Sequence, residues 1–87
     1  MRLVMTRHAE EQIVERELER AWVERVALNP EWTKPDPRPG VMRHFGVIPE
    51  FGGRVLWVAV AQGGGWRRVL SAHFDRDARR PPDAADL

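Results

Sequence analysis

The stretch "RVLWVAVAQGGGWRRVLSAHF", residues 54–74, decides the fold of this chain. Residues 54–62 are apolar on both faces over most of their length, which is typical of a central strand. The three glycines at 63–65 predict a tight turn, and residues 66–74 form a second strand. Two strands joined by so short a turn predict an antiparallel hairpin.

A third strand precedes this hairpin. The segment "VMRHFGVIP" at 41–49 has strand character, and "EFGG" at 50–53 predicts the turn that follows it. Residues 41–74 are therefore expected to form a three-stranded antiparallel meander.

The N-terminal part predicts a short strand and a first helix. Leu3–Met5 is the strand, and Thr6 is a suitable N-cap for the helix that follows. Ala9 and Ile13 lie four residues apart, as on one face of a helix, and this helix should extend to about Arg16.

A second helix should end at Asn29, because the residue before Pro30 is driven out of the helical conformation. Four prolines and a glycine then predict a stiff loop over residues 30–40, in which Trp32 would fill the gap between helix and sheet. The buried face of the second helix is expected to consist of Leu18, Trp22, Val23 and Val26.

The expected fold class is α+β, in the order β-α-α-β-β-β. Two N-terminal helices should pack on one face of a small antiparallel sheet. Residues 1–80 would form a single domain, with a short helical turn after the last strand, and residues 81–87 a flexible C-terminal tail.

Composition narrows the class of protein. With 87 residues the chain can build one small core, and without cysteine it has neither disulfides nor a thiolate metal site. No apolar run approaches the roughly 20 residues that span a bilayer, so we expect no membrane partner and a cytoplasmic location. Residues 38–68 carry five arginines against one acidic residue, Glu50, which predicts a local anion-binding surface.

The histidines and arginines together suit RNA cleavage without a metal or another cofactor. Such a reaction needs an acid and a base near neutral pH, which histidine supplies, and cations on the phosphate, which arginine supplies. The catalytic candidates are His73, His8 and His44, and the phosphate-binding candidates are Arg54, Arg43 and Arg67.

Strand alternation predicts which candidates meet. If Leu56 and its alternate neighbours face the helices, Trp57 points to the open face of the sheet. His44, His73 and Arg67 would join it there, and Trp57 could stack a nucleobase. A one-residue bulge, or the opposite parity in one strand, would separate the group.

Each of the three candidate histidines also has a purely structural interpretation. His73 can be a strand-end histidine bonded to a neighbour, His44 an exposed side chain without a role, and His8 a partner of the backbone or of Arg16. The three histidines lack paired metal-ligand spacing, so no metal site is predicted. Ser71 and His73 lack the elbow motif of a nucleophilic serine. The glycines at 63–65 precede no helix, which argues against a phosphate loop.

Three segments carry a resemblance to a known family. They are "TRHAEEQIVERELERAWVERVALNP", "GGRVLWVAVA" and "RRVLSAHFDRDARR". Together they resemble the bacterial family of unknown function numbered 4258, whose members show a T-x-H-A opening, an arginine closing the first helix, an N-P after the second and a strand ending in T/S-A-aromatic. His8, Arg16 and Arg54 match family positions, and His73 stands where an aromatic residue is usual.

The resemblance implies a topology similar to RelE/ParE/BrnT-like toxins, which include translation-linked ribonucleases. On this basis we expect a toxin-like, metal-independent endoribonuclease that acts on RNA and is silenced by an antitoxin protein. Arg54, with Arg67 or Arg43, would hold phosphate, and Arg16 is a further phosphate-binding candidate. His73 would transfer protons, with His8 or His44 as its helper. The alternative is a non-catalytic domain that binds protein or nucleic acid through its basic sheet face, or pairs with a second copy as a homodimer.

Overall fold

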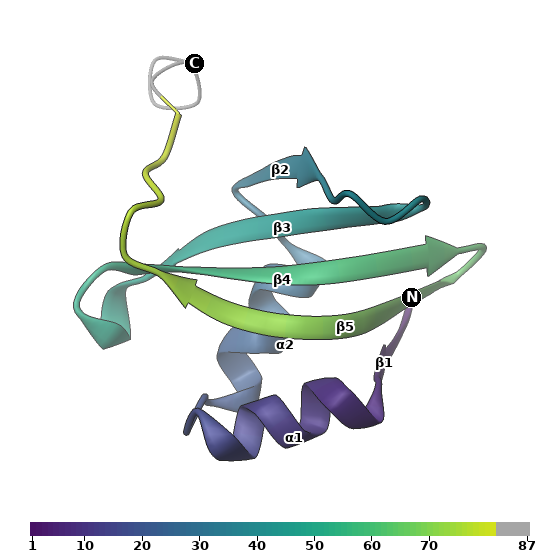
Figure 1. The fold of residues 1–87 in the computed structure, drawn as a ribbon, viewed down its shortest axis with the longest axis horizontal. Helices are drawn as coiled ribbons and strands as arrows, with labels where there is room; N and C mark the ends of the chain where they lie inside the picture. Colours follow the sequence, from purple (N-terminus) through teal and green to yellow (C-terminus); the bar gives the residue numbers. More distant parts are fainter. Residues whose placement is uncertain (82–87) are drawn as a thin grey trace.

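The computed structural model describes residues 1–81, in which both helices lie on the same side of a five-stranded sheet (Figure 1). No helix in this part of the chain is long and apolar enough to cross a membrane. In chain order the elements are β1 (Arg2–Met5), α1 (Arg7–Glu15), α2 (Arg20–Leu28), β2 (Trp32–Pro35), β3 (Val41–Ile48), the 3-10 turn η1 (Pro49–Phe51), β4 (Arg54–Gly63) and β5 (Trp66–Asp75).

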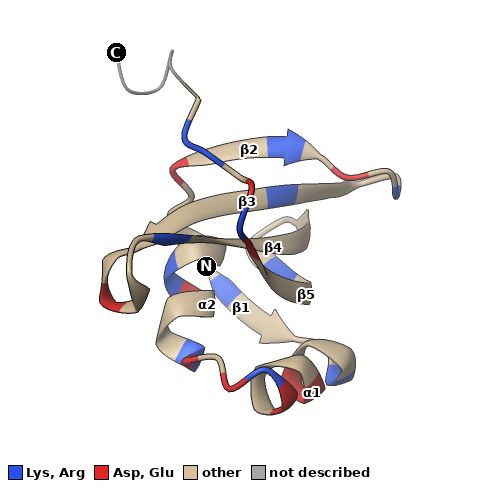
Figure 2. Cartoon of the chain, turned by 60° about the vertical axis from the view of Figure 1, so that its left-hand side comes forward, with Lys and Arg blue, Asp and Glu red and all other residues tan. Residues whose placement is uncertain are grey.

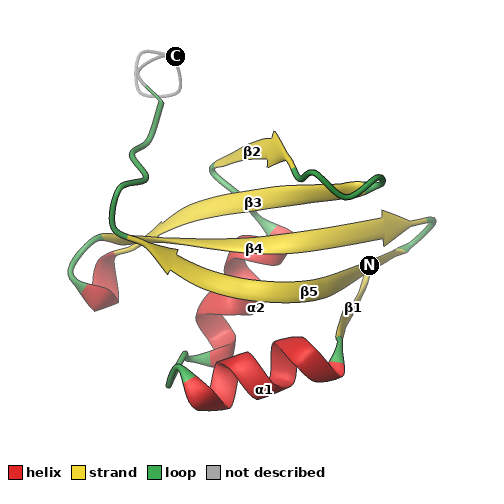
Figure 3. Ribbon diagram, viewed as in Figure 1, coloured by secondary structure: helices red, strands yellow, loops and turns green. Residues whose placement is uncertain are grey.

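The sheet has the strand order β1-β5-β4-β3-β2 (Figure 3). The meander of β3, β4 and β5 is antiparallel, as predicted. The sheet as a whole is mixed, because β1 runs parallel to β5, and the expectation of a purely antiparallel sheet was wrong. Local turn signals could not reveal this pair, since parallel neighbours need a long connection.

Strand β2 corrects the prediction of a proline-rich loop. Trp32–Pro35 pairs antiparallel with β3, with Trp32 opposite Phe45. Because β2 is an edge strand, Pro35 at its end is tolerated although it lacks an N–H. Trp32 consequently lies in the sheet and stacks on Phe45, and it does not fill a gap between helix and sheet.

Local signals place both helices. The hydroxyl of Thr6 accepts a hydrogen bond from the N–H of Ala9 at 3.1 Å, which confirms the predicted N-cap of α1. That helix ends at its C-cap Arg16, and α2 ends at Asn29, both as predicted. Leu18 is buried as expected but precedes the first turn of α2.

The core lies between the two helices and the face of the sheet that they cover. Alternate residues of β4 point into it, as predicted, so β4 is the central strand. The largest fully buried side chains of this core are those of Ile48, Leu56, Val23, Val26, Val58, Val60 and Val69.

Helix α1 also protects the free edge of β5. Beyond β1, Ala72 has no strand on the side of β5 that faces away from β4, and the side chains of Gln12 in α1 and of its C-cap Arg16 take the place of one. The N–H of Ala72 donates to Gln12 Oε1 at 2.9 Å, and Arg16 Nη1 donates to the carbonyl of Ala72 at 2.8 Å. These contacts block further strand pairing at this edge.

The chain continues past β5 across the open face of the sheet, toward the beginning of β2 (Figure 2). Asp75 Oδ1 accepts hydrogen bonds from the N–H groups of Asp77 and Ala78, which turns the chain without the predicted helical turn. A salt bridge joins Arg80 to Glu31 beside β2. Of the predicted flexible tail, residues 82–87 lie outside the described residues.

Candidate nucleic-acid interface

Four rings form a row across the open face of the sheet, one from each of β2, β3, β4 and β5. The strand register places Trp32 opposite Phe45, Phe45 opposite Trp57 and Trp57 opposite His73. The ring centroids are 5.2, 6.2 and 4.3 Å apart along this row. Phe45 is only 5% exposed, so a ligand would meet the half-buried Trp32, Trp57 and His73. We call these four residues the aromatic row.

Cations lie on the aromatic row. The guanidinium carbon of Arg43 is 4.5 Å from the centroid of the Trp57 ring, and Lys34 Nζ is 5.7 Å from that of Phe45. Trp57 thus packs against both Arg43 and His73. Rings and guanidinium planes are the surfaces on which unpaired nucleobases stack, and the positive charges suit the phosphates between them.

A carboxylate holds two of the neighbouring arginines in position. Asp36 Oδ1 accepts from Arg38 Nε at 2.9 Å, and Oδ2 accepts from Arg43 Nε at 3.0 Å. Hydrogen bonds from Arg38, followed by that from Arg43, hold the pKa of Asp36 well below its usual range. Asp36 therefore remains ionised and fixes Arg43 above Trp57.

His73 is held by Arg16 at the β5 end of the row. Arg16 Nη1 lies 2.7 Å from His73 Nδ1, and because a guanidinium can only donate, Nδ1 must accept. Burial, and then the charges of Arg16, Arg43 and His8, lower the pKa of His73. The ring is thus neutral at pH 7, with its proton on Nε2. In this arrangement Nε2–H can donate to a ligand, whereas the Nδ1 lone pair is occupied.

His44 faces the helices, and the prediction that it shares the open face with His73 was wrong. It is 5% exposed, and its Nδ1 donates to the carbonyl of Ala27 at 3.0 Å. Burial is the main reason that its pKa is lowered, and the charge of Arg67 adds to the effect. The parity of β3 is opposite to the expected one, so Phe45 occupies the open face instead.

Arg67 also lies on the helix side of the sheet. A bulge causes this: Ser71 pairs with Ala59 but Val69 pairs with Val60, so Leu70 is extra and the parity of β5 reverses. Arg67 Nη1 consequently donates to the last carbonyls of α2, those of Ala27 at 2.8 Å and Leu28 at 3.0 Å.

The remaining candidates lie at the margins of the face. His8 is exposed on α1, near enough to His73 for its charge to affect that ring. Arg54 is exposed at the start of β4, with its guanidinium carbon 5.1 Å from the Phe51 ring centroid. Within residues 1–81, no three His, Asp or Glu side chains lie together in a group that could hold a metal ion.

Sequence reasoning missed Trp32 because it assigned residues 30–40 to a loop, and it missed Phe45 because it assigned the opposite parity to β3. The signal was present, since Trp32 and Lys34 alternate with Thr33 in the manner of an edge strand. No protein-family model, no curated protein and no solved structure matches this chain.

Proposed function

We propose that this protein binds single-stranded RNA on the open face of its sheet. The observation that carries the proposal is the packing of Trp57 against Arg43 and His73, on a face with further aromatic and cationic side chains. Stacking surfaces combined with cations are what proteins use for unpaired strands. The Nε2–H of His73 is a donor for the 2′-hydroxyl, the group by which RNA differs from DNA.

The proposal includes kinship with the family numbered 4258 and with RelE/BrnT-like toxins. Its support is the quoted sequence resemblance, together with two helices that cover one face of the sheet and leave the other open. An antitoxin protein, or a second copy of the chain, would compete with RNA for that open face.

A tryptophan substitution tests the binding proposal. Fluorescence anisotropy with a labelled ten-nucleotide RNA should show a loss of about 5- to 150-fold in affinity for Trp57→Ala, the range expected when one base loses its aromatic partner. Trp66→Ala is the matched control, because Trp66 lies at the β4–β5 turn away from the row, and its effect should be below about twofold. Equal losses in both variants, with both folded, would refute a specific role for the row.

Metal-independent RNA cleavage is the second candidate, and the contact of Arg16 with His73 favours it. If Arg16 moved onto a phosphate, Nδ1 of His73 would be freed to accept the proton of the 2′-hydroxyl. The 2′-oxygen would then attack the adjacent phosphorus while the bond from phosphorus to the 5′-oxygen breaks, and the leaving 5′-oxygen would take a proton from water. The test is incubation of end-labelled RNA in EDTA with the wild type and His73→Gln. The binding function alone predicts intact RNA in both; cleavage by the wild type that His73→Gln abolishes would establish the nuclease.

A further inference from the structure

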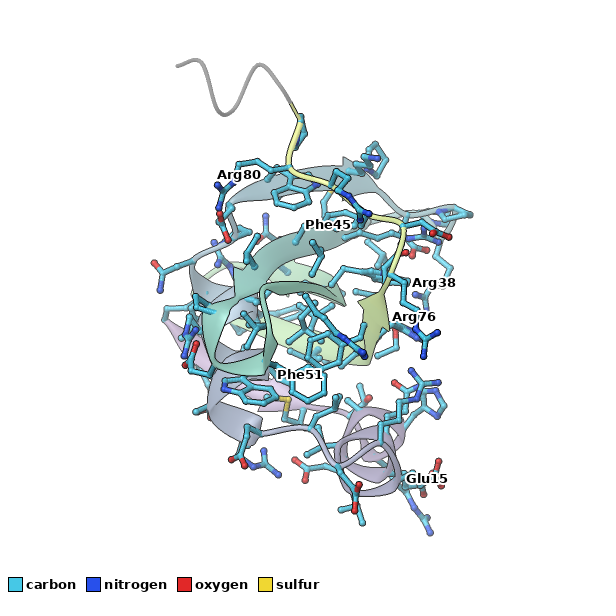
Figure 4. The ribbon with its side chains drawn as sticks, turned by 90° about the vertical axis from the view of Figure 1, so that its left-hand side faces the viewer. Glu15, Arg38, Phe45, Phe51, Arg76 and Arg80 are labelled. Carbon is cyan, nitrogen blue, oxygen red and sulfur yellow. The ribbon has the colours of Figure 1, made fainter. Side chains whose placement is uncertain are left out.

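A hollow lies at the end of the open face, between the chain after β5 and the turn that joins β3 to β4. Its volume is about 350 Å³. Val47 and Val55 contribute apolar lining, and Gly52 and Gly53 contribute backbone without side chains. In Figure 4 the chain from Arg76 to Arg80 passes in front of this end of the sheet.

The hollow has an excess of positive charge. Four arginines line it, whereas Asp75 is its one acidic lining residue within residues 1–81. The Asp75 carboxylate is engaged by the N–H groups of Asp77 and Ala78. The lining arginines are Arg54, Arg76, Arg79 and Arg80.

The contacts of these arginines leave most of that charge uncompensated. Arg80 is paired with Glu31, and Arg79 donates to the carbonyls of Arg76 and Ala78, which carry no charge. Arg54 contacts the ring of Phe51. Among the described residues, Arg54, Arg76 and Arg79 make no salt bridge to a carboxylate. An anion in the hollow would therefore supply compensating charge.

We propose that the hollow binds a phosphate group of the RNA strand whose bases contact the aromatic row, an inference that rests on the proposed function. Val55 and Trp57 point to the same face of β4, two residues or about 7 Å apart, so the hollow adjoins the row. Guanidinium groups match the oxygens of phosphate in geometry as well as in charge. The chain after β5 thus contributes a phosphate subsite to the RNA-binding face.

The first experiment tests the hollow without RNA. Pyrophosphate added at constant ionic strength should shift the amide NMR signals of Gly52, Gly53 and Ala78. The variant Arg54→Gln/Arg76→Gln should weaken this binding by about tenfold or more while it spares the contacts of Arg79 and Arg80 that hold the chain in place. Arg2→Gln/Arg7→Gln removes the same charge from exposed positions elsewhere and should leave the affinity unchanged.

The second experiment uses RNA and its dependence on salt. Loss of one phosphate contact should make the slope of log affinity against log salt concentration shallower by about 0.7 in Arg54→Gln/Arg76→Gln. If pyrophosphate shifts the amide NMR signals but the protein does not bind RNA, the proposed function is refuted and the anion site in the hollow is retained. If RNA binds but Arg54→Gln/Arg76→Gln leaves the salt slope unchanged, and if this variant responds to pyrophosphate as the control variant does, the phosphate site in the hollow is refuted. The proposed RNA binding would still stand.

Discussion

His44 and His73 show how position decides what one residue type can do. Both rings are neutral at pH 7, because burial lowers their pKa values below the ordinary value for histidine. His44 donates to the carbonyl of Ala27 inside the core, whereas His73 accepts from Arg16 and keeps its Nε2–H at the open face. Only His73 can therefore contact a ligand on that face.

These lowered pKa values predict that stability depends on pH. Between the folded and unfolded pKa values of a histidine, the unfolded chain binds more protons, so the free energy of unfolding should fall as the pH drops from about 7 to 5. Carboxylates titrate lower; Arg25, for example, holds the pKa of Glu50 at about 2. Urea unfolding at pH 7, 6 and 5 measures the effect. In the double variant His44→Gln/His73→Gln the free energy of unfolding should depend less on pH. An unchanged dependence on pH would show that the two histidines are not its cause.

Arg67 and Arg68 are adjacent arginines with different roles. Arg67 bonds the final carbonyls of α2, where a positive charge also opposes the negative end of the helix dipole. Arg67→Ala should therefore lower the free energy of unfolding by about 1–2 kcal/mol. Arg68 is exposed, with its guanidinium over Trp66, so Arg68→Ala should change it by less than about 0.5 kcal/mol. Chemical denaturation of the two variants compares them, and equal effects would contradict the capping role of Arg67.

At the scale of elements, the contact between β3 and α2 depends on a glycine. A Cβ built at Gly46 would lie 2.9 Å from Cγ2 of Val26, closer than side chains tolerate. Gly46→Ala should destabilise the protein by about 1–3 kcal/mol, because the helix must move away from the strand. Gly64→Ala is the control, since its Cβ would meet nothing within 4 Å. Thermal unfolding of both variants tests this. An unchanged unfolding midpoint for Gly46→Ala would show that α2 can move away from β3 without a cost in stability.

The elements that could be predicted are those whose ends carry local signals. Thr6 marks the start of α1, Asn29 the end of α2, and two glycine-containing turns separate β3, β4 and β5. Strand β2 was missed because its prolines suggested a loop, although an edge strand accepts proline where no partner needs the N–H. Trp32 was missed together with β2, and Phe45 was missed because the expected parity of β3 was the opposite of the observed one, so only half of the aromatic row was predicted.

At the scale of the whole molecule, stability should be greatest at the centre of the sheet. Strand β4 is hydrogen-bonded on both sides and its inward side chains are fully buried, whereas β1 and β2 are edges. In amide hydrogen exchange, Val58 and Val60 should exchange slowest, and the amide of Lys34 should exchange by orders of magnitude faster. Comparable protection of Lys34 and Val58 would show instead that β2 opens only with the whole fold.

Sequence by itself determined the hairpins and the helix ends, because turns and caps act over a few residues. Only the tertiary structure decided the parallel contact of β1 with β5 and the faces occupied by His44 and Arg67. Alternation along a strand divides its residues into two sets but does not say which set is buried. The bulge at Leu70 then exchanges the two sets within β5, which places Arg67 against α2 and leaves His73 beside Trp57.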